Sequence, residues 1–440
     1  MDSKENIDNK ICQCGKKHKI KTQSMTVGTG QIENIANVMS QFNLPKNVMI
    51  VSDTNTYDAA GDEVAKRLKA GGYVVAEHIF DAKKLIHPDE VSVGQLMFAM
   101  EPEPQMIVAV GSGTINDLCR FCASRIKVPY MVVATAPSMD GYASTVSPIT
   151  RNGVKKTYNG IHPEIIVSDV DVLKKAPMNM LAAGFGDIVG KIPARLDWML
   201  GNIVLGEDMC ETVVGVTNSA VEQCMNASGE LKNRSLKAVE ETMGALITSG
   251  IAMQMNGNSR PASGAEHHIA HFLEMRDAGI HNPDSLHGAN VGIASLITMR
   301  FYEKLFSNDD LYQGDVPDDD TYLIMMKKAY GQYAQTILDE VEFFFFSMEE
   351  RSEHLAIIKE NFNKLQSETK NISKIIAQTK TVLKACGGPV HPTDLRYSRE
   401  MMYDAIKFAR LIRTRYTILD FLDNLGQLEA YTQEILDELY

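Results

Sequence analysis

The 440-residue chain has no apolar run approaching the roughly 18 residues that a membrane-spanning helix needs. Its N-terminus, MDSKENIDNKICQCGKKHKIK, has no apolar core after its charged positions. We therefore expect neither a membrane span nor a signal peptide.

Cysteine is scarce and scattered, with seven residues at positions 12, 14, 119, 122, 210, 224 and 386. An odd, dispersed set in a chain without a secretion signal predicts reduced thiols and a cytoplasmic location. Cys12, Cys14 and His18 fit no closed zinc-site spacing, and no second cysteine pair follows them. Residues 1–24 are therefore predicted to be a plain N-terminal extension.

Positive charge is also in short supply, because 44 Lys and Arg residues face 56 Asp and Glu residues and leave a net charge of -12. This balance argues against broad nucleic-acid binding. It leaves room for a small anionic substrate, since local cations can outweigh the net charge.

Short apolar runs alternate with helical patterns in the first third of the chain. This alternation predicts a mainly parallel, doubly wound α/β sheet. The expected strands are Asn47–Asp53, Tyr73–Phe80, Gln105–Val110, Pro129–Thr135 and Glu164–Ser168. The expected helices between them are Tyr57–Ala70, Pro88–Met100 and Thr114–Ser124.

Beyond about residue 175 the pattern becomes helical throughout. The clearest segments are Asn179–Leu200, Ala220–Asn226, Ser235–Asn256, Gly264–Asp277 and Val291–Lys304. We predict an extension (1–24), a Rossmann-like nucleotide-binding α/β domain (25–175) and an all-α metal- and substrate-binding domain (176–440). Clefts between such domains commonly hold ligands.

Gly111-Ser112-Gly113-Thr114 stands directly between a predicted strand and a predicted helix. Glycines let a phosphate approach the backbone, and the helix N-terminus faces the anion with free N–H groups. The loop is not GxGxxG, so a simple tight turn is an equal alternative. Asp53, at the end of a strand, suits either an adenosine ribose or a helix cap.

The stretch ATAPSMDGYAS follows the fourth predicted strand, at the edge where doubly wound sheets bind ligands. Asp140 is its only charged residue. Alone, it is more often a turn residue than a ligand.

Five of the eleven histidines lie between Ser263 and Gly288. His267 and His271 are four residues apart and share one helical face, whereas His268 is expected on the surface. His287 can return through a loop holding His281. With Asp187 in GFGDIVGK, expected to open a helix, His267 and His287 form a possible catalytic metal site. The alternative is chance spacing and an N-cap aspartate.

Taken in order, GSGTINDLCR, TAPSMDGYAS, GFGDIVGK, SRPASGAEHHIAH and LHGANVG resemble the iron-containing alcohol dehydrogenases and glycerol dehydrogenases, whose fold is shared with dehydroquinate synthase. The similarity is greatest to the sn-glycerol-1-phosphate dehydrogenase branch and covers about residues 25–430. PASGAEH with LHG is specific to that branch, whereas the GSGT loop is more widespread.

The resemblance implies reduction of dihydroxyacetone phosphate to sn-glycerol 1-phosphate by NADH or NADPH, with a zinc, iron or nickel ion polarising the carbonyl. Asp140 would hold a substrate hydroxyl, and His271 would relay a proton. The implied metal ligands are Asp187, His267 and His287. The implied cofactor contacts are Gly111, Gly113, Thr114, Asp117, Thr135, Ser138 and Ser144, to which Asp53 is added from its position.

Several alternatives stay open. The substrate can be an unphosphorylated polyol such as glycerol, or the enzyme can be a dehydroquinate-synthase-like lyase; a non-catalytic binding protein is the least favoured. Arg260 and Lys191 are candidates for the phosphate, with surface charges as the plainer reading. Asp53 favours NADH, because a carboxylate repels a 2′-phosphate. We expect a homo-oligomer, with a dimer as the simplest form.

Overall fold

The computed structural model describes residues 11–84, 86–151, 154–277, 285–307, 311–314, 319–340 and 346–440. The chain divides into two compact units. The first comprises residues 1–188 and 215–258, and the second comprises residues 189–214 and 259–440. The domain boundary between residues 175 and 176, which the sequence suggests, stays a prediction.

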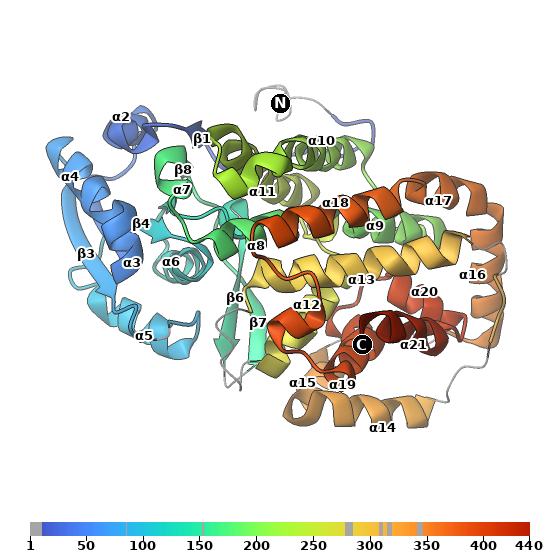
Figure 1. Ribbon diagram of the computed structural model, residues 1–440. Helices are drawn as coiled ribbons and strands as arrows, with labels where there is room; N and C mark the ends of the chain where they lie inside the picture. Colours follow the sequence, from blue (N-terminus) through green and yellow to red (C-terminus); the bar gives the residue numbers. More distant parts are fainter. Residues whose placement is uncertain are drawn as a thin grey trace. The chain divides into compact units, whose positions relative to one another are not determined.

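The first unit contains a six-stranded parallel sheet with the order β1-β8-β5-β4-β2-β3. The predicted parallel α/β fold is thereby confirmed, and Figure 1 shows its strands in blue to green. The strands are β1 (Ser24–Gly28), β2 (Asn47–Asp53), β3 (Val74–Phe80), β4 (Met106–Gly111), β5 (Tyr130–Ala134) and β8 (Ile165–Asp169).

The central strands are buried along their whole length because helices cover both faces of such a sheet. In β4 every residue is buried, and β5 and β8 share that pattern. The helices of this unit are α2 (Ile35–Gln41), α3 (Thr54–Thr56), α4 (Asp62–Ala70), α5 (Glu90–Ala99), α6 (Gly113–Ile126), α7 (Val170–Leu173), α8 (Met178–Val189), α10 (Glu211–Ala227, from Gly215 on) and α11 (Leu236–Asn256).

Three strands were not expected from the sequence. β1 is short and only half-buried. β6 (Val146–Arg151) and β7 (Val154–Asn159) form a separate antiparallel hairpin. The sequence of β6 contains Ser147 and Pro148, and that of β7 contains Lys155 and Lys156. Neither strand therefore has the apolar run that marks a buried strand in a sequence.

The second unit is helical in its described residues, as predicted. Its helices are α9 (Lys191–Leu205), α12 (Ala265–Asp277), α13 (His287–Ser307), α14 (Asp319–Tyr330), α15 (Ala334–Glu340), α16 (Met348–Glu360), α17 (Phe362–Thr369), α18 (Ile372–Ala385), α19 (Arg399–Phe408), α20 (Ile418–Asn424) and α21 (Leu428–Leu439). Figure 1 shows them in yellow to red, apart from the green α9. α12 packs against α13, α19 and the 3-10 turn Ala409–Ile412.

A buried carboxylate joins four elements of the second unit. Asp197 on α9 accepts hydrogen bonds from Tyr302 Oη (2.6 Å), Ile418 N (2.8 Å) and Ala265 N (2.6 Å). These donors belong to α13, α20 and the first residue of α12. Asp197 thus fixes where α12, with its histidines, begins.

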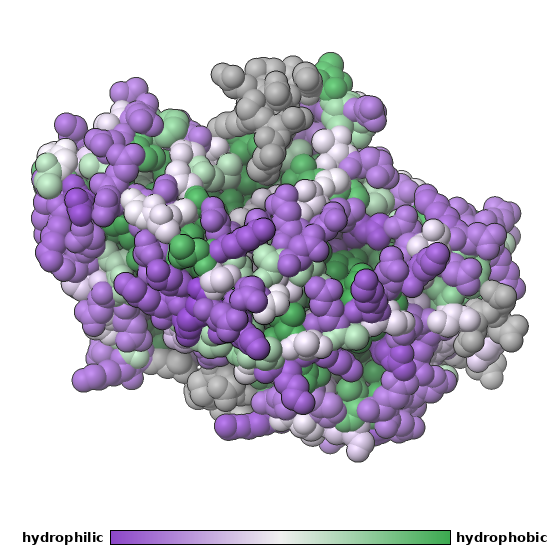
Figure 2. Space-filling view, turned by 45° about the horizontal axis from the view of Figure 1, so that its top comes forward, coloured by the Kyte–Doolittle hydropathy of each residue, from purple (hydrophilic) through white to green (hydrophobic). Residues whose placement is uncertain are grey.

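Hydrophilic residues cover much of the face drawn in Figure 2, with hydrophobic residues in small groups among them. No helix among the described residues is both long and apolar enough to cross a bilayer.

Candidate functional site

Three imidazoles gather in the second unit, where α12 approaches the start of α13. His267 and His271 lie one turn apart on α12, and His287 is the first residue of α13. The ring centroid of His287 lies 5.4 Å from that of His267 and 5.4 Å from that of His271. His281, which the sequence assigns to the connecting loop, lies outside the described residues.

Two glutamates orient these rings. Glu266 Oε1 accepts a hydrogen bond from Nδ1 of His267 at 2.7 Å. Glu274 accepts one from Nδ1 of His287 at 2.7 Å and one from Nδ1 of His271 at 3.0 Å. A carboxylate on Nδ1 fixes the tautomer and leaves the Nε2 lone pair for a metal or a donor. The sequence analysis missed both glutamates, although Glu274 follows His267 and His271 at helical spacings of seven and three.

Burial favours the neutral form of two histidines on α12, His268 and His271. Burial lowers the pKa of His271 to about 3, although Glu274 acts in the opposite direction. Burial and nearby arginines also lower the pKa of His268 well below its usual value. The expectation that His268 lies on the surface is wrong, because its side chain is fully buried. A neutral imidazole at position 271 can accept a hydrogen bond or a metal, but it carries no proton on Nε2 to give at neutral pH.

Two arginines lie beside the imidazoles, on the segment that follows the 3-10 turn Ala409–Ile412. Arg413 Nη2 approaches Nε2 of His271 at 3.4 Å. Arg415 donates to the backbone oxygen of Ser263 (2.8 Å) and to Ser259 Oγ (3.2 Å). Among the described residues, no carboxylate lies within 4.0 Å of either guanidinium.

This cationic cluster is poorly compensated. Burial lowers the pKa of Arg413, and burial together with the charges of Arg413 and Arg260 lowers that of Arg415 to about 9. Neither ring nitrogen of the buried His268 has a hydrogen-bond partner within the described part of the chain. An anion at this place would relieve the repulsion between the guanidinium groups.

Arg260 and Lys191, the phosphate candidates from the sequence, contact groups of the protein itself. Arg260 is buried and contacts the carboxylate of Glu207 through Nε (2.9 Å) and Nη2 (2.8 Å). Its Nη2 also donates to the backbone oxygens of Asp197 and Tyr416. Lys191 is buried too, and its Nζ donates to the backbone oxygen of Ala262 at 3.2 Å. The plainer reading of both as surface charges is therefore also wrong.

In the first unit, the glycine loop joins β4 directly to α6. A side chain at Gly111 would place Cβ 2.6 Å from Cβ of Ile115, so only glycine fits there. Gly113 and Thr114 form the first turn of the 14-residue α6, whose leading N–H groups have no partners within the helix. Asp117 accepts a hydrogen bond from Arg120 Nη1 at 2.7 Å. That turn can receive a phosphate group, with Asp117 as part of its frame.

The Asp140 loop packs into the same unit. Its residues Thr135, Ser138, Asp140 and Ser144 are all buried. Thr135 N donates to the backbone oxygen of Gly111 at 3.2 Å, which ties this loop to the glycine loop. Asp140 Oδ2 accepts from Ser249 Oγ on α11 at 2.8 Å.

Asp187 belongs to this arrangement as well. Its Oδ2 accepts a hydrogen bond from the backbone N of Asp140 at 2.8 Å. The side chain is fully buried. The expectation that Asp187 opens a helix is wrong, because it lies near the end of α8. It is therefore not an N-cap, which removes the plainer alternative for this residue.

Asp53 caps a helix. Its side chain accepts a hydrogen bond from Thr56 N at 2.9 Å, and Thr56 Oγ1 accepts one from Asp53 N at 2.9 Å. This capping box at the end of β2 confirms one of the two alternatives for Asp53 and leaves its second oxygen for a ribose.

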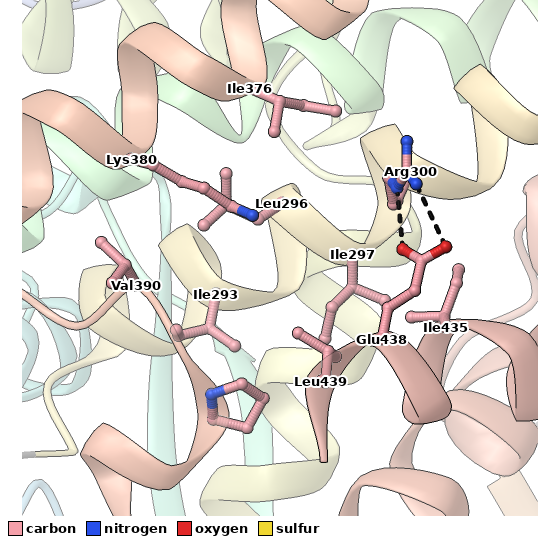
Figure 3. A pocket seen from close by; sticks show the side chains of 11 residues that line it. Ile293, Leu296, Ile297, Arg300, Ile376, Lys380, Val390, Ile435, Glu438 and Leu439 are labelled. Carbon is pink, nitrogen blue, oxygen red and sulfur yellow. Dashed lines mark hydrogen bonds and ion pairs between the residues drawn. The ribbon is translucent and has the colours of Figure 1, made fainter.

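A separate hollow in the second unit has few polar side chains that could bind or react with a substrate. It is lined mainly by aliphatic side chains of α13, α18 and α21, among them Ile293, Ile297 and Ile376 (Figure 3). Its charged pair, Arg300 and Glu438, is joined in an ion pair (Figure 3). This hollow has no group of metal-ligating side chains, unlike the histidine cluster.

Comparisons with known proteins identify the family. The family described as iron-containing alcohol dehydrogenase matches residues 26–177. A glycerol-1-phosphate dehydrogenase (NAD(P)+) of Halalkalibacterium halodurans is 36% identical over 295 residues, which are 66% of this chain and 74% of that protein. One from Bacillus velezensis is 30% identical over 419 residues, 94% of each chain.

Solved structures match over almost the whole length. The crystal structure of a 1,3-propanediol oxidoreductase gives a TM-score of 0.64 at 16% identity, covering 94% of this chain and 98% of the other. Glycerol dehydrogenase from Schizosaccharomyces pombe gives 0.58 at 15% identity, covering 95% and 91%. At such identities the likeness shows a shared fold.

Proposed function

The chain belongs to the glycerol-1-phosphate dehydrogenase family, and from this premise we propose that it interconverts dihydroxyacetone phosphate and sn-glycerol 1-phosphate with NAD(H) or NADP(H) and one divalent metal ion. The observation that carries the choice of a phosphorylated substrate is the pair Arg413 and Arg415 beside the imidazoles. A polyol dehydrogenase has no use for uncompensated guanidinium groups next to its metal ligands.

His267 and His287 suit a metal because a carboxylate on Nδ1 of each orients the ring and makes Nε2 the ligand atom. We assign Asp187 as the third ligand, following the family pattern. Three protein ligands leave open positions, where the ion would polarise the substrate carbonyl as a Lewis acid. Zinc, nickel and iron all accept this nitrogen and oxygen set.

Arg413 and Arg415 recognise the phosphate in this proposal. Guanidinium groups form bidentate, charge-assisted hydrogen bonds with phosphate oxygens. A bound dianion would offset the burial that lowers the pKa of both guanidinium groups, and the repulsion from Arg413 and Arg260 that acts on Arg415. Arg413 would also connect the phosphate to His271, whose Nε2 it already approaches.

The first unit supplies the cofactor contacts. The α6 N-terminus at Gly111, Gly113 and Thr114 would hold the pyrophosphate, with Asp117 in the frame and Asp53 at the adenosine ribose. The loop residues Thr135, Ser138 and Ser144 would surround the nicotinamide. Asp140, held by Ser249, would fix a substrate hydroxyl and so select one face of the carbonyl.

His271 takes part as a neutral imidazole. Its lowered pKa favours the neutral imidazole over an imidazolium at neutral pH. It would instead orient a water molecule or the substrate oxygen through Nε2, with Glu274 behind it. Proton movement through bound water stays compatible with this role.

Steady-state kinetics with and without the phosphate group test the proposal. The metal-loaded enzyme should use dihydroxyacetone phosphate far better than dihydroxyacetone. Arg413→Met and Arg415→Met should each lower kcat/KM for the phosphate ester about 10- to 150-fold, since hydrogen bonds to charged groups contribute about 1.5–3 kcal/mol. Both changes should affect the weak activity with dihydroxyacetone much less, because this substrate has no phosphate.

Arg399→Met is the matched control, because this arginine pairs with Asp437 at the surface. Equal use of dihydroxyacetone and its phosphate would replace the proposal with a polyol dehydrogenase. Turnover of a phosphorylated substrate without net NADH oxidation would replace it with a lyase.

Two further expectations concern the location and the oligomeric state of the enzyme. We place the enzyme in the cytoplasm, as its scattered cysteines suggest. We also expect a homodimer, which light scattering of the purified chain would test.

A further inference from the structure

Cys12, Cys14 and His18, whose spacing fits no closed zinc site, come together in the N-terminal segment. The Sγ atoms of Cys12 and Cys14 and a ring nitrogen of His18 lie within 4.8 Å of one another. We propose that these three residues bind a second metal ion, Zn²⁺ by its chemistry, in a structural site separate from the histidine cluster.

The backbone between the cysteines is a tight turn of the kind that presents two thiolates to one ion. Gly15 N donates to the backbone oxygen of Cys12 at 2.8 Å, and Cys12 N donates to that of Lys16 at 3.0 Å. Gly15 has a φ of 79°, in the left-handed region that favours glycine. Glycine at position 15 is therefore what this turn requires.

A hydrogen bond orients the ring of His18 as it does in metal-binding histidines. Its Nδ1 donates to the backbone oxygen of Met255 at 2.7 Å, so its Nε2 carries the lone pair. That Nε2 lies 3.4 Å from Sγ of Cys14. The side chain is 4% exposed, although the segment around it is polar. A backbone carbonyl on the distal nitrogen is a frequent partner of a metal-ligating histidine.

The donor set selects the ion. Two thiolates with an imidazole favour Zn²⁺ over Mg²⁺ or Ca²⁺, which prefer oxygen ligands. Lysines at positions 16, 17, 19 and 21 offset the negative charge of the thiolates.

Such a site would fasten the N-terminal segment to α11. The segment already contacts this helix, because Lys21 N and Thr22 N donate to Oε1 of Gln254 at 2.9 and 3.4 Å. α11 also carries Ser249, which holds Asp140. The ion would therefore stabilise the helix that supports the Asp140 loop without taking part in the reaction.

The test uses the full-length chain, purified under reducing conditions and loaded with Zn²⁺ or Co²⁺. Elemental analysis should give about two zinc ions per chain, and Co²⁺ should produce a thiolate-to-metal charge-transfer band. The Cys12→Ser/Cys14→Ser double variant should lose one ion and the band, yet keep its activity. Cys386→Ser, at a buried cysteine of the second unit, is the control that keeps both.

His267→Ala separates this proposal from the proposed function. It should lose one ion and turnover but keep the charge-transfer band. Absence of the band in the wild-type chain, or full metal content in the double cysteine variant, would overturn the N-terminal site. Full metal content in His267→Ala would overturn only the catalytic ligand assignment.

Discussion

Glu274 accepts hydrogen bonds from Nδ1 of His287 through Oε1 and from Nδ1 of His271 through Oε2. One carboxylate on α12 therefore sets the tautomer of two imidazoles, one of them on α13. Glu274→Gln keeps the shape of the side chain but removes its charge and one acceptor atom. We expect it to weaken metal binding about 10- to 100-fold.

Competition with a chromogenic chelator measures that affinity. Glu360→Gln at the exposed end of α16 is the matched control and should leave it unchanged. Wild-type affinity in Glu274→Gln would mean that His287 does not bind the ion through Nε2.

The glycine loop and the central strands follow from the sequence because each depends on local signals. β2 and β4 each contain a continuous apolar run, and Gly111 is the last residue of β4. Spacing alone also predicted that His267 and His271 share a helical face. His287 could be expected near these two histidines because few residues separate it in the sequence from the helix that carries them.

The anion site could not be predicted in this way. Arg413 lies 142 positions from His271, and nothing in the segment RTRYT marks it as a partner. Arg260, next to PASGAEH, was a better guess by proximity, but Glu207 neutralises it. Contacts between residues far apart in the sequence decide which arginines lack a carboxylate partner. Local sequence patterns do not predict such contacts.

Gly184 on α8 permits a close approach of the Asp140 loop. A Cβ atom there would lie 1.8 Å from the carbonyl oxygen of Pro137, so Gly184→Ala must displace the loop or the helix. We expect the free energy of unfolding to fall by about 1–3 kcal/mol, as for other overpacked sites. Turnover should fall as well, because the displaced loop carries Asp140.

Gly244→Ala on α11 is the control for this change, since a Cβ atom there meets no other atom within 4 Å. Replacing this helical glycine should raise stability by about 0.5–1 kcal/mol. Urea unfolding curves of the two variants should therefore shift in opposite directions. Equal shifts would show that α8 and the loop adapt freely.

Asp197 links the stability of the second unit to pH. Burial, reinforced by the charge of Glu266, raises its pKa to about 7. Between about pH 4 and pH 7 the folded chain therefore holds a proton at this site that the unfolded chain has released. The contribution of Asp197 to stability must fall as the pH rises through this window and then level off.

Asp197→Asn removes that titration. The stability difference between wild type and variant should be larger at pH 5 than at pH 8, by about one to a few kcal/mol. Unfolding at both pH values, with a chelator present so that neither protein holds metal, measures it. The exposed Asp437→Asn serves as control, and a pH-independent difference for Asp197→Asn would show that the buried carboxylate stays ionised throughout.

Asp53 allows its two roles to be separated, because asparagine caps helices as well as aspartate does. Asp53→Asn should preserve the cap on Thr56 and leave stability nearly unchanged. Removal of the negative charge should raise the ratio of kcat/KM for NADPH to that for NADH by about tenfold, since a carboxylate repels the 2′-phosphate. Asp58→Asn, on the exposed face of the same segment, should not alter the ratio. If Asp53→Asn also leaves the ratio at its wild-type value, Asp53 serves the helix alone, and the adenosine ribose is recognised elsewhere in the unit.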